Sequence, residues 1–306
     1  MSGFDKTNEI EEAVRRAIYK WVNATSPITQ DVLVGDTVLN VVDTKRFMKG
    51  DNVVIQDTVE AEYQLTVKKI IDEHQIELSS GVLNDWTMAK NPVLAKTINN
   101  MMVQGIYLGD VNIPMYPAIT VSAEDVSSEW ITINSTKERY EVTINGFVED
   151  STQEEGHKFI NRIKDTIVQG LKRNIHMIVG DYAATALTVD ASRGDTEITV
   201  FDTSVFNPEN RHIIIEDNHG RTVLSLEEIV DGTTLRMFYN SALCQDHLVS
   251  DDAIVIQPER YIYNSWPGNH STGKMVKESL LQGCSIQWFA EEEEYQFYRN
   301  QDTSIK

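Results

Sequence analysis

The segment from Gly268 to Lys274 has the spacing of a phosphate-binding loop. It reads Gly-Asn-His-Ser-Thr-Gly-Lys and fits the G-x-x-x-x-G-K part of the motif, whose backbone N–H groups surround nucleotide phosphates. Two parts of the motif are missing. Met275 stands where Ser or Thr would hold Mg²⁺, and Pro267 stands where a central strand would lead into the loop. We therefore interpret the segment as a glycine-rich hairpin loop, with a nucleotide-binding enzyme as the alternative.

A second group with chemical potential is His212, Glu216 and His219, which could ligate a metal ion. In a strand, His212 and Glu216 share one face, whereas His219 falls in a turn and has the opposite parity. The spacing is therefore weak for a metal site. The two cysteines, Cys244 and Cys284, are too few and too far apart for a zinc site or a disulfide framework.

No Ser, Cys or His nucleophile sits in a recognisable elbow, and no carboxylate pair stands out from the many acidic residues. The sequence therefore predicts no catalytic residues, no metal and no cofactor. We expect that the chain is not an enzyme.

The strongest internal signal is a repeat. The sequence GDTVLNVVDTKRF begins at Gly35, and GDTEITVFDTSVF begins at Gly194. Both copies continue through an apolar triplet and a second apolar strand, and the register between them slips by one residue and then returns. Two copies are too few for a solenoid, so we interpret the repeat as one β-module used twice. The recurring Asp-Thr pairs at Asp43 and Asp202 are typical of turns in which the Asp side chain bonds nearby backbone.

Two amphipathic helices flank the first copy of the repeat and the strands that follow it. Apolar residues at helical spacing predict a helix over residues 7–22, with Thr7 as its N-cap. A second helix is predicted over residues 151–174, where Ser151 and Glu154 form a capping box. Each helix has one apolar stripe, which must be buried against another element.

Alternation of apolar and polar residues predicts antiparallel strands at 117–121, 129–133 and 139–144, and a last strand near 281–289. With the two helices, these strands make an α+β core in which helices cover one face of a small antiparallel sheet. The β-modules are then insertions in surface loops, where added length costs little closure entropy. The predicted core is discontinuous, at residues 1–31, 97–186 and 258–306, and the first and second β-modules are residues 32–96 and 187–257.

The charge of the chain restricts its partners. It carries 47 acidic and 27 basic side chains, a net charge of −20, which argues against tight binding to nucleic acid. An acidic wall nevertheless lets DNA pass without sticking. The acidic runs at 150–155 and 291–294 are candidates for such a wall, although a solvated strand end also explains the second. The N-terminus has no signal-like apolar region and no stretch approaches 18 apolar residues, so no membrane association is expected.

Three features together resemble the tail terminator proteins of the bacteriophage head–tail neck. They are the helix that ends near Trp21, the strand Tyr116–Val121, and the passage from strand to helix between Tyr140 and Leu171. The resemblance covers the predicted core, about half of the chain, and consists of hydrophobic patterns. The chain is longer than a minimal terminator because of its two modules, which are similar to β-modules found in phage structural proteins.

The resemblance implies a structural virion protein that forms a ring, a hexamer in this family, at the end of the tail tube. The implied partners are further copies of the chain, the tail tube protein, the tail sheath protein and the head–tail connector. The implied location is the virion tail or neck, after assembly in the host cytoplasm. A sheath-capping, collar or baseplate ring is the alternative within the same tail, and a β-rich adhesin or carbohydrate-binding module is a further one.

The aromatic residues of the core form either a contact patch or part of the sheet interior. Trp130 has the opposite parity to Ile131 and Ile133, so we expect it to point away from the helix-covered face. We predict a subunit contact at Trp130, together with Tyr116 and Pro117, on a free face or edge of the sheet. The other aromatic residues in question are Trp266, Trp288, Tyr261 and Tyr263.

Overall fold

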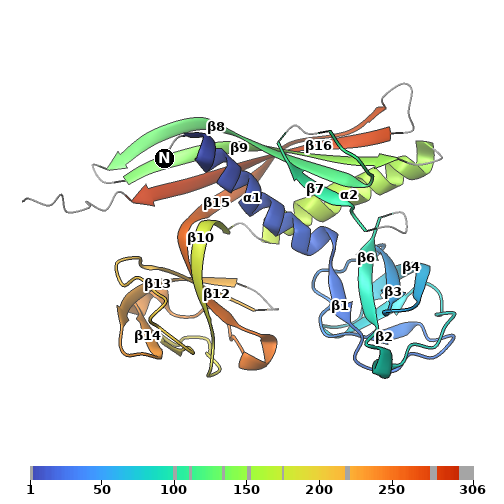
Figure 1. Ribbon diagram of the computed structural model, residues 1–306, viewed down its shortest axis with the longest axis horizontal. Coiled ribbons are helices and arrows are strands. Elements are labelled where there is room, and N and C mark those ends of the chain that lie inside the picture. The colour runs from blue at the N-terminus through green and yellow to red at the C-terminus, as the bar shows by residue number, and fades with distance from the viewer. Residues whose placement is uncertain are drawn as a thin grey trace, which may run out of the picture. The chain divides into compact units, whose positions relative to one another are not determined.

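The computed structural model describes residues 3–98, 102–109, 112–132, 135–149, 153–173, 176–217, 221–275 and 281–295. The chain divides into two compact units. Unit 1 comprises Met1–Met177 and Ile262–Lys306, and unit 2 comprises Ile178–Tyr261. Each unit is described by itself below, and Figure 1 labels the elements of both.

Unit 1 contains a sheet of long antiparallel strands in the order β15-β16-β9-β8, with the short β7 paired in parallel to β8. The strands are β7 (Gly105–Leu108), β8 (Ala118–Thr132), β9 (Ser135–Glu149), β16 (Leu281–Tyr295) and the part of β15 (Ile254–Met275) from Ile262 onward. β8, β9 and β16 are 15 residues long each. Strands of about five to six residues are usual, so these are unusually long.

Two helices cover one face of this sheet (Figure 1): α1 (Gly3–Val22) contacts β7 and β8, whereas α2 (Gln153–Arg173) contacts β9 and β16. The covered face is built from alternate residues that pair across the strands. Val142 pairs with Trp288, and Ile144 pairs with Ile286, and all four side chains are fully buried. The helices also contact each other, where Gly170 leaves room for the ring of Trp21. In the described part of the chain, no helix is both long and apolar enough to cross a membrane.

The first helix is longer than its sequence pattern indicates. It extends upstream to Gly3, so Thr7 lies inside the helix and the prediction that it is the N-cap is wrong. An ion pair from Lys6 to Glu138 of β9, at 2.8 Å, ties this added turn to the sheet. The second helix is described from Gln153, and the predicted capping residue Ser151 lies outside the described residues.

The strands expected at 117–121 and 129–133 form one continuous strand, β8, so their prediction as two separate strands is wrong. The polar stretch between them does not interrupt the strand, because its backbone stays paired with β9, for example at Ala123 with Val142 and Asp125 with Tyr140. The two helices divide this sheet between them. α1 covers β8, and α2 lies on β9 and β16.

The α+β fold class predicted from the sequence is wrong. The described part of the chain contains two α-helices and 16 β-strands, and its long curled sheets make the fold β-rich. Polar residues in the middle of long strands hid how far each strand extends. Hydrogen bonds between neighbouring strands hold such residues in an extended form, whatever their individual propensity.

The first β-module forms a six-stranded antiparallel sheet in the order β1-β6-β3-β4-β5-β2. It encloses its own apolar core, centred on Ile55, Ile76 and Trp86. A short 3₁₀ helix (Met88–Lys90) precedes β6. The strands are β1 (Thr25–Pro27), β2 (Val38–Asn40), β3 (Asn52–Gln56), β4 (Ala61–Ile70), β5 (Gln75–Leu78) and β6 (Val93–Thr97).

Unit 2 contains the second β-module, in which β11, β14, β13, β12 and the first part of β15 pair in that order. Its separate apolar core is centred on Ile213, Ile215 and Leu235. The predicted division into a discontinuous core with two inserted modules stays a prediction. The strands are β10 (Met177–Ala186), β11 (Glu197–Thr199), β12 (His212–Glu216), β13 (Arg221–Ile229) and β14 (Thr234–Met237), and the 3₁₀ helices are Tyr239–Ser241 and Val249–Asp251.

Candidate functional site

The predicted contact residues lie at two ends of β8. Tyr116 is partly exposed and Pro117 is buried just before the strand, where the carbonyl of Pro117 accepts a hydrogen bond from the N–H of Gln104 at 2.9 Å. The backbone of Trp130 lies near the far end of β8, opposite Thr136 of β9. The side chain of Trp130 lies outside the described residues, so its predicted role stays a prediction.

The segment predicted to be a hairpin loop is part of a strand. Residues from Gly268 to Lys274 lie within β15 and pair with β16, with register shifts between Pro267 and His270 and between Thr272 and Lys274. Pro267 is accommodated because a proline fits a strand beside such a shift, where the ladder hydrogen bonds are interrupted. The loop prediction is therefore wrong, and the extended backbone offers no loop that could surround a phosphate.

The possible metal ligands do not converge in the described part of the structure. The ring of His212 packs against the ring of Tyr261, with centroids 4.7 Å apart. Glu216 forms an ion pair with Arg221, in which Oε2 and Nη2 are 2.6 Å apart. His219 lies outside the described residues. Among the residues that are described, no group of three His, Cys, Asp or Glu side chains could hold a metal ion. Cys284 is buried, which raises the pKa of its thiol to about 11.

The aromatic and acidic residues near the end of the sheet are largely internal. Trp288 is fully buried, whereas Trp266 is half-buried and lies 5.7 Å from the ring of Phe289, with the guanidinium of Arg139 over both rings.

Glu291 is 8% exposed and its carboxylate lies 2.8 Å from Lys137 Nζ. Burial by itself raises the pKa of Glu291. Hydrogen bonds from Lys137 and Asn264 lower the pKa by a larger amount, so that it lies below its usual value.

Glu292 is 1% exposed. The expectation that the run 291–294 is a solvated strand end, or part of an acidic wall, is therefore wrong for its first two residues. The side chains of the last two lie outside the described residues, as do residues 150–152 of the other acidic run.

A pocket of about 610 Å³ lies within unit 1, between the first β-module and α2. We call it the basic pocket. Its wall consists of one turn of the module, the polar face of α2 and His270 of β15. The lining residues are Met48, Lys49, Gly50, Asp51, Lys158, Asn161, Arg162, Lys164, Asp165, Thr166, Val168, Gln169, Lys172 and His270.

The turn Met48–Asp51 is shaped by one glycine and one carboxylate. Gly50 has a φ of +88°, which side-chain-bearing residues rarely adopt, and its N–H donates to the carbonyl of Val67 at 2.7 Å. Asp51 Oδ2 accepts a hydrogen bond from the N–H of Met48, also at 2.7 Å. A Cβ placed on Gly50 would lie 3.8 Å from Arg162 Nη2, so the turn lies directly against α2.

Beneath this turn lies a buried ion pair. Lys96 Nζ of β6 is 2.8 Å from Asp51 Oδ2, and their side chains are 1% and 3% exposed. Burial lowers the pKa of Lys96, and the attraction of Asp51 offsets part of that effect. Arg162 of α2 adds a second positive charge nearby, which lowers the pKa of Lys96 further. The pair therefore lies buried beneath the turn that lines the basic pocket.

The second helix supplies most of the charge in the pocket. Lys158, Arg162, Asp165, Gln169 and Lys172 follow at spacings of four, three, four and three residues, which places them on one face of the helix. Burial lowers the pKa of the Arg162 guanidinium, and Asp51 raises it in part.

The lining holds five Lys and Arg side chains against two Asp side chains. Of the two carboxylates, Asp51 is paired with Lys96, and Asp165 lies 3.8 Å from Nζ of Lys164, which is one of the five cations. The hydroxyl of Thr166 is fully buried and has no hydrogen-bond partner among the described residues. Converging cations and a free hydroxyl donor are the groups that bind oxyanions such as carboxylates.

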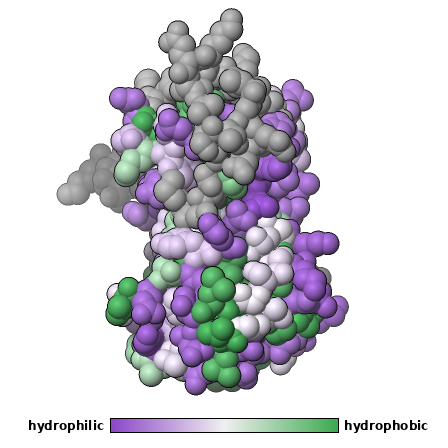
Figure 2. Space-filling view, turned by 90° about the vertical axis from the view of Figure 1, so that its right-hand side faces the viewer, coloured by the Kyte–Doolittle hydropathy of each residue, from purple (hydrophilic) through white to green (hydrophobic). Residues whose placement is uncertain are grey.

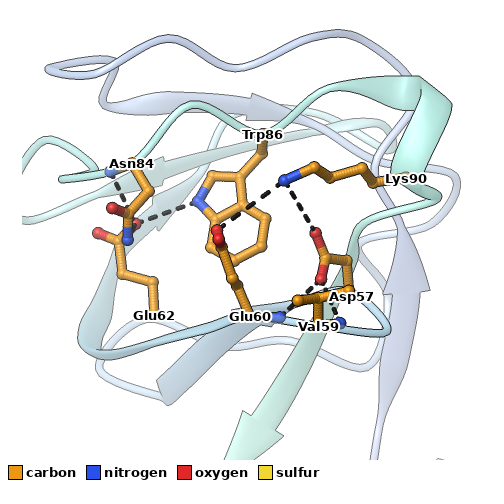
Figure 3. A network of polar contacts seen from close by, with 7 residues as sticks. All are labelled: Asp57, Val59, Glu60, Glu62, Asn84, Trp86 and Lys90. Carbon is orange, nitrogen blue, oxygen red and sulfur yellow. Dashed lines mark hydrogen bonds and ion pairs between the residues drawn. The ribbon is translucent and has the colours of Figure 1, made fainter.

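The first β-module carries a second polar network (Figure 3). The indole N–H of Trp86 donates to Glu62 Oε2 at 3.1 Å, and Glu62 also accepts the N–H groups of Leu83 and Asn84. Asp57 accepts the N–H groups of Glu60 and Val59, at 2.7 Å each, and these bonds lower its pKa. Trp86 is 1% exposed and Glu62 is 4% exposed, so the network fixes the module internally.

The second module places a different chemical group in the equivalent position. His247 bridges to Ala191 as Trp86 bridges to Val32. His247 Nδ1 lies 2.6 Å from Asp217 Oδ2, and its Nε2 lies 2.7 Å from Thr222 Oγ1. A carboxylate, an imidazole and a hydroxyl in this order are the parts of a nucleophilic triad. Both His247 and Thr222 are almost fully buried, at 0% and 4% exposure. We therefore interpret them as a structural replacement for Trp86 and Glu62.

Reasoning from the sequence missed the basic pocket. The helix 151–174 is predicted from its apolar stripe and its capping box, and the sequence pattern assigns no role to its polar face. The signal that could have found the pocket is the series of charged residues on the polar face of the helix, in a chain that is acidic elsewhere.

Most of the face in Figure 2 is hydrophilic, with a band of hydrophobic residues on the first module.

Comparisons with known proteins identify no family. No protein-family model matches the chain, and no curated protein matches it. One solved structure with some similarity is the Gp54 tailspike of Acinetobacter baumannii bacteriophage AP22, in complex with a capsular saccharide of its host. It is 15% identical, covers 31% of this chain and 19% of its own length, and has a TM-score of 0.23. A similarity at this level carries no argument about fold or function.

Proposed function

We propose that the chain is a structural virion protein of a bacteriophage tail, and that it forms a ring at the head-proximal end of the tail tube. The observation that carries this proposal is the outer edge of β8. β7 pairs with Ala118–Val121 alone, and in the described pairings the outer edge of β8 beyond Val121 has no further strand beside it. A free strand edge presents backbone donors and acceptors to another chain.

The geometry of unit 1 supports contacts along this edge. A strand of 15 residues spans about 50 Å, whereas a helix of about 20 residues spans about 30 Å, so the strands extend past the helices. The first residues of β8 are buried, but Glu124, Asp125 and Val126 are exposed. The carboxylate of Glu11 accepts the N–H of Ala123 at 2.8 Å, and the edge beyond that point is available to a neighbouring copy.

The proposed partners are those of a tail ring: further copies of the chain, the tail tube, the tail sheath and the head–tail connector. Purified protein imaged by electron microscopy should show closed rings. In a phage that encodes this chain, its deletion should give tails of uncontrolled length or tails that do not join heads. Normal, joined tails in the deletion would contradict the proposal.

Trp130→Ala tests the role of β8 directly. Truncating a large aromatic residue in an interface often costs about 2 kcal/mol or more, roughly a 30-fold loss of affinity. We expect weaker self-association, measured by sedimentation velocity, with an unchanged melting temperature. Tyr63→Ala, at a half-exposed position of the first module, is the control. Unfolding of the Trp130→Ala monomer would place Trp130 in the core instead.

A further inference from the structure

Unit 2 is strongly acidic. Residues 178–261 contain 15 Asp and Glu side chains and five Arg side chains, a net charge of −10, and they contain no lysine. Several of the acidic side chains are exposed, including Glu227, Glu228 and Asp252. Unit 2 therefore offers carboxylates to any basic surface that meets it.

The basic pocket of unit 1 has the opposite character. It gathers five cationic side chains in a chain whose net charge is −20. Lys158 and Lys172 are exposed at the rim, and Arg162 lies half-buried between them in sequence. The buried hydroxyl of Thr166 has no hydrogen-bond partner among the described residues and can donate to an oxyanion.

We propose that the basic pocket of one copy receives carboxylate side chains from unit 2 of a neighbouring copy. This inference rests on the proposed ring and names one of its contacts. The contact joins two different surfaces of the same chain, so it is heterologous. Heterologous contacts generate closed rings when the rotation between neighbours closes. Complementary charge also steers the two surfaces together and fixes their register.

A protein carboxylate is favoured over a nucleic-acid phosphate as the occupant. The overall charge of −20 repels a long polyanion before it reaches the pocket. A carboxylate of unit 2 is a separate charge on a folded surface, so it enters the pocket without a continuous line of neighbouring phosphates. Inorganic phosphate is the appropriate probe for the alternative of a free anion.

Charge reversal at the rim tests the inference. Lys158→Glu with Lys172→Glu should raise the dissociation constant of the assembly at least tenfold, as measured by sedimentation velocity at 50 mM NaCl. The matched control is Lys68→Glu with Lys69→Glu, two exposed lysines of the first module in the same unit. The control makes the same change in net charge and should assemble as the wild type does. Raising the salt to 500 mM should weaken wild-type assembly, because screening shortens the range of the attraction.

Zero-length carbodiimide coupling identifies the occupant. A mixture of ¹⁴N- and ¹⁵N-labelled protein distinguishes links between copies from links within one copy. We expect mixed-isotope links from Lys158 or Lys172 to Asp or Glu residues in 178–261. Unit 2 has no lysine, so in each such link unit 2 supplies the carboxylate and the other copy supplies the lysine.

The outcomes separate this inference from the proposed function. A wild-type chain that stays monomeric at all concentrations would contradict the ring itself, and the contact with it. Rings that persist unchanged in Lys158→Glu/Lys172→Glu would leave the ring standing and overturn the contact. Inter-copy links from these lysines only to residues outside 178–261 would overturn it as well. The contact would also be overturned if the pocket bound phosphate in a calorimetric titration while Lys158→Glu/Lys172→Glu left assembly unaffected.

Discussion

The first β-module closes its turn at Met48–Asp51 over a buried ion pair, whereas the second closes the equivalent turn over a neutral amide. Val54 pairs with Ala95, and Ile214 pairs with Ile256, so the next residues, Lys96 and Gln257, occupy equivalent positions. Gln257 Oε1 accepts the N–H of Asn207 at 2.7 Å. Its amide Nε2 donates to the carbonyls of Asn207 and Asn210 at 2.9 and 2.6 Å.

The surrounding framework of the two modules is the same. Asp43 and Asp202 each accept the N–H two residues ahead at 2.8 Å. The hydroxyls of Thr44 and Thr203 each donate to a carbonyl 28 residues later. Because these turns match, the difference between Lys96 and Gln257 is a local substitution within one fold. The module fold needs a polar group beneath the turn and does not need a charge there.

A buried ion pair is seldom retained for stability alone, since desolvation of both charges offsets much of their attraction. The charged version occurs in the module whose turn faces the basic pocket. Lys96 neutralises Asp51 beneath the turn, so that this carboxylate does not offset the cationic side chains of the pocket. Gln257 shows what the turn requires when no such pocket is built on it.

The largest expected loss of stability comes from removing one polar side chain beneath the turn of each module. Asp51→Ala leaves the ammonium of Lys96 buried without its partner, which should lower the free energy of unfolding by about 3–5 kcal/mol. Gln257→Ala leaves neutral backbone groups unpaired and should cost about 1–3 kcal/mol. All five tryptophans lie in unit 1, so urea unfolding followed by their fluorescence measures the first change. Hydrogen exchange of residues 187–257 measures the second. If Asp51→Ala and Gln257→Ala lowered stability equally, the charged and the neutral arrangement would not differ in their energetic role.

A smaller effect is expected when the first module is given neutral groups like those of the second. Asp51→Asn with Lys96→Gln should change the free energy of unfolding by less than about 2 kcal/mol, because no unpaired charge remains buried. The same urea titration measures it, with Asp51→Ala as the reference. If the double variant lost as much stability as Asp51→Ala, then the ion pair itself would be required for the module to fold.

The smallest effect is a dependence on pH. Burial lowers the pKa of Lys96 below 10.5, so between its lowered pKa and 10.5 the unfolded chain binds more protons at this site than the folded chain. Stability contributed by this site therefore rises with pH across that window. The wild type should gain stability relative to Asp51→Asn/Lys96→Gln as the pH is raised toward 10.5, as measured by urea unfolding. A relative loss would mean that Lys96 is stabilised in its charged form.

The sequence by itself determined the features that depend on local chemistry. The repeat at Gly35 and Gly194 predicted two β-modules, and the turns at Asp43 and Asp202 have the Asp-to-backbone bonds expected of them. The apolar stripes located both helices to within a few residues, because a 3.6-residue period is visible in the sequence itself.

Only the tertiary structure decided the β-rich fold class and the basic pocket. Strand length depends on the backbone hydrogen bonds of the neighbouring strand, so β8 continues through polar residues and β15 continues through Pro267 and Gly268. The pocket combines a turn near residue 50 with a helix face near residue 162, and Lys96 lies beneath that turn. Charges that far apart along the chain interact only after folding has brought them within a few ångströms in a poorly solvated place, and no local pattern specifies that distance.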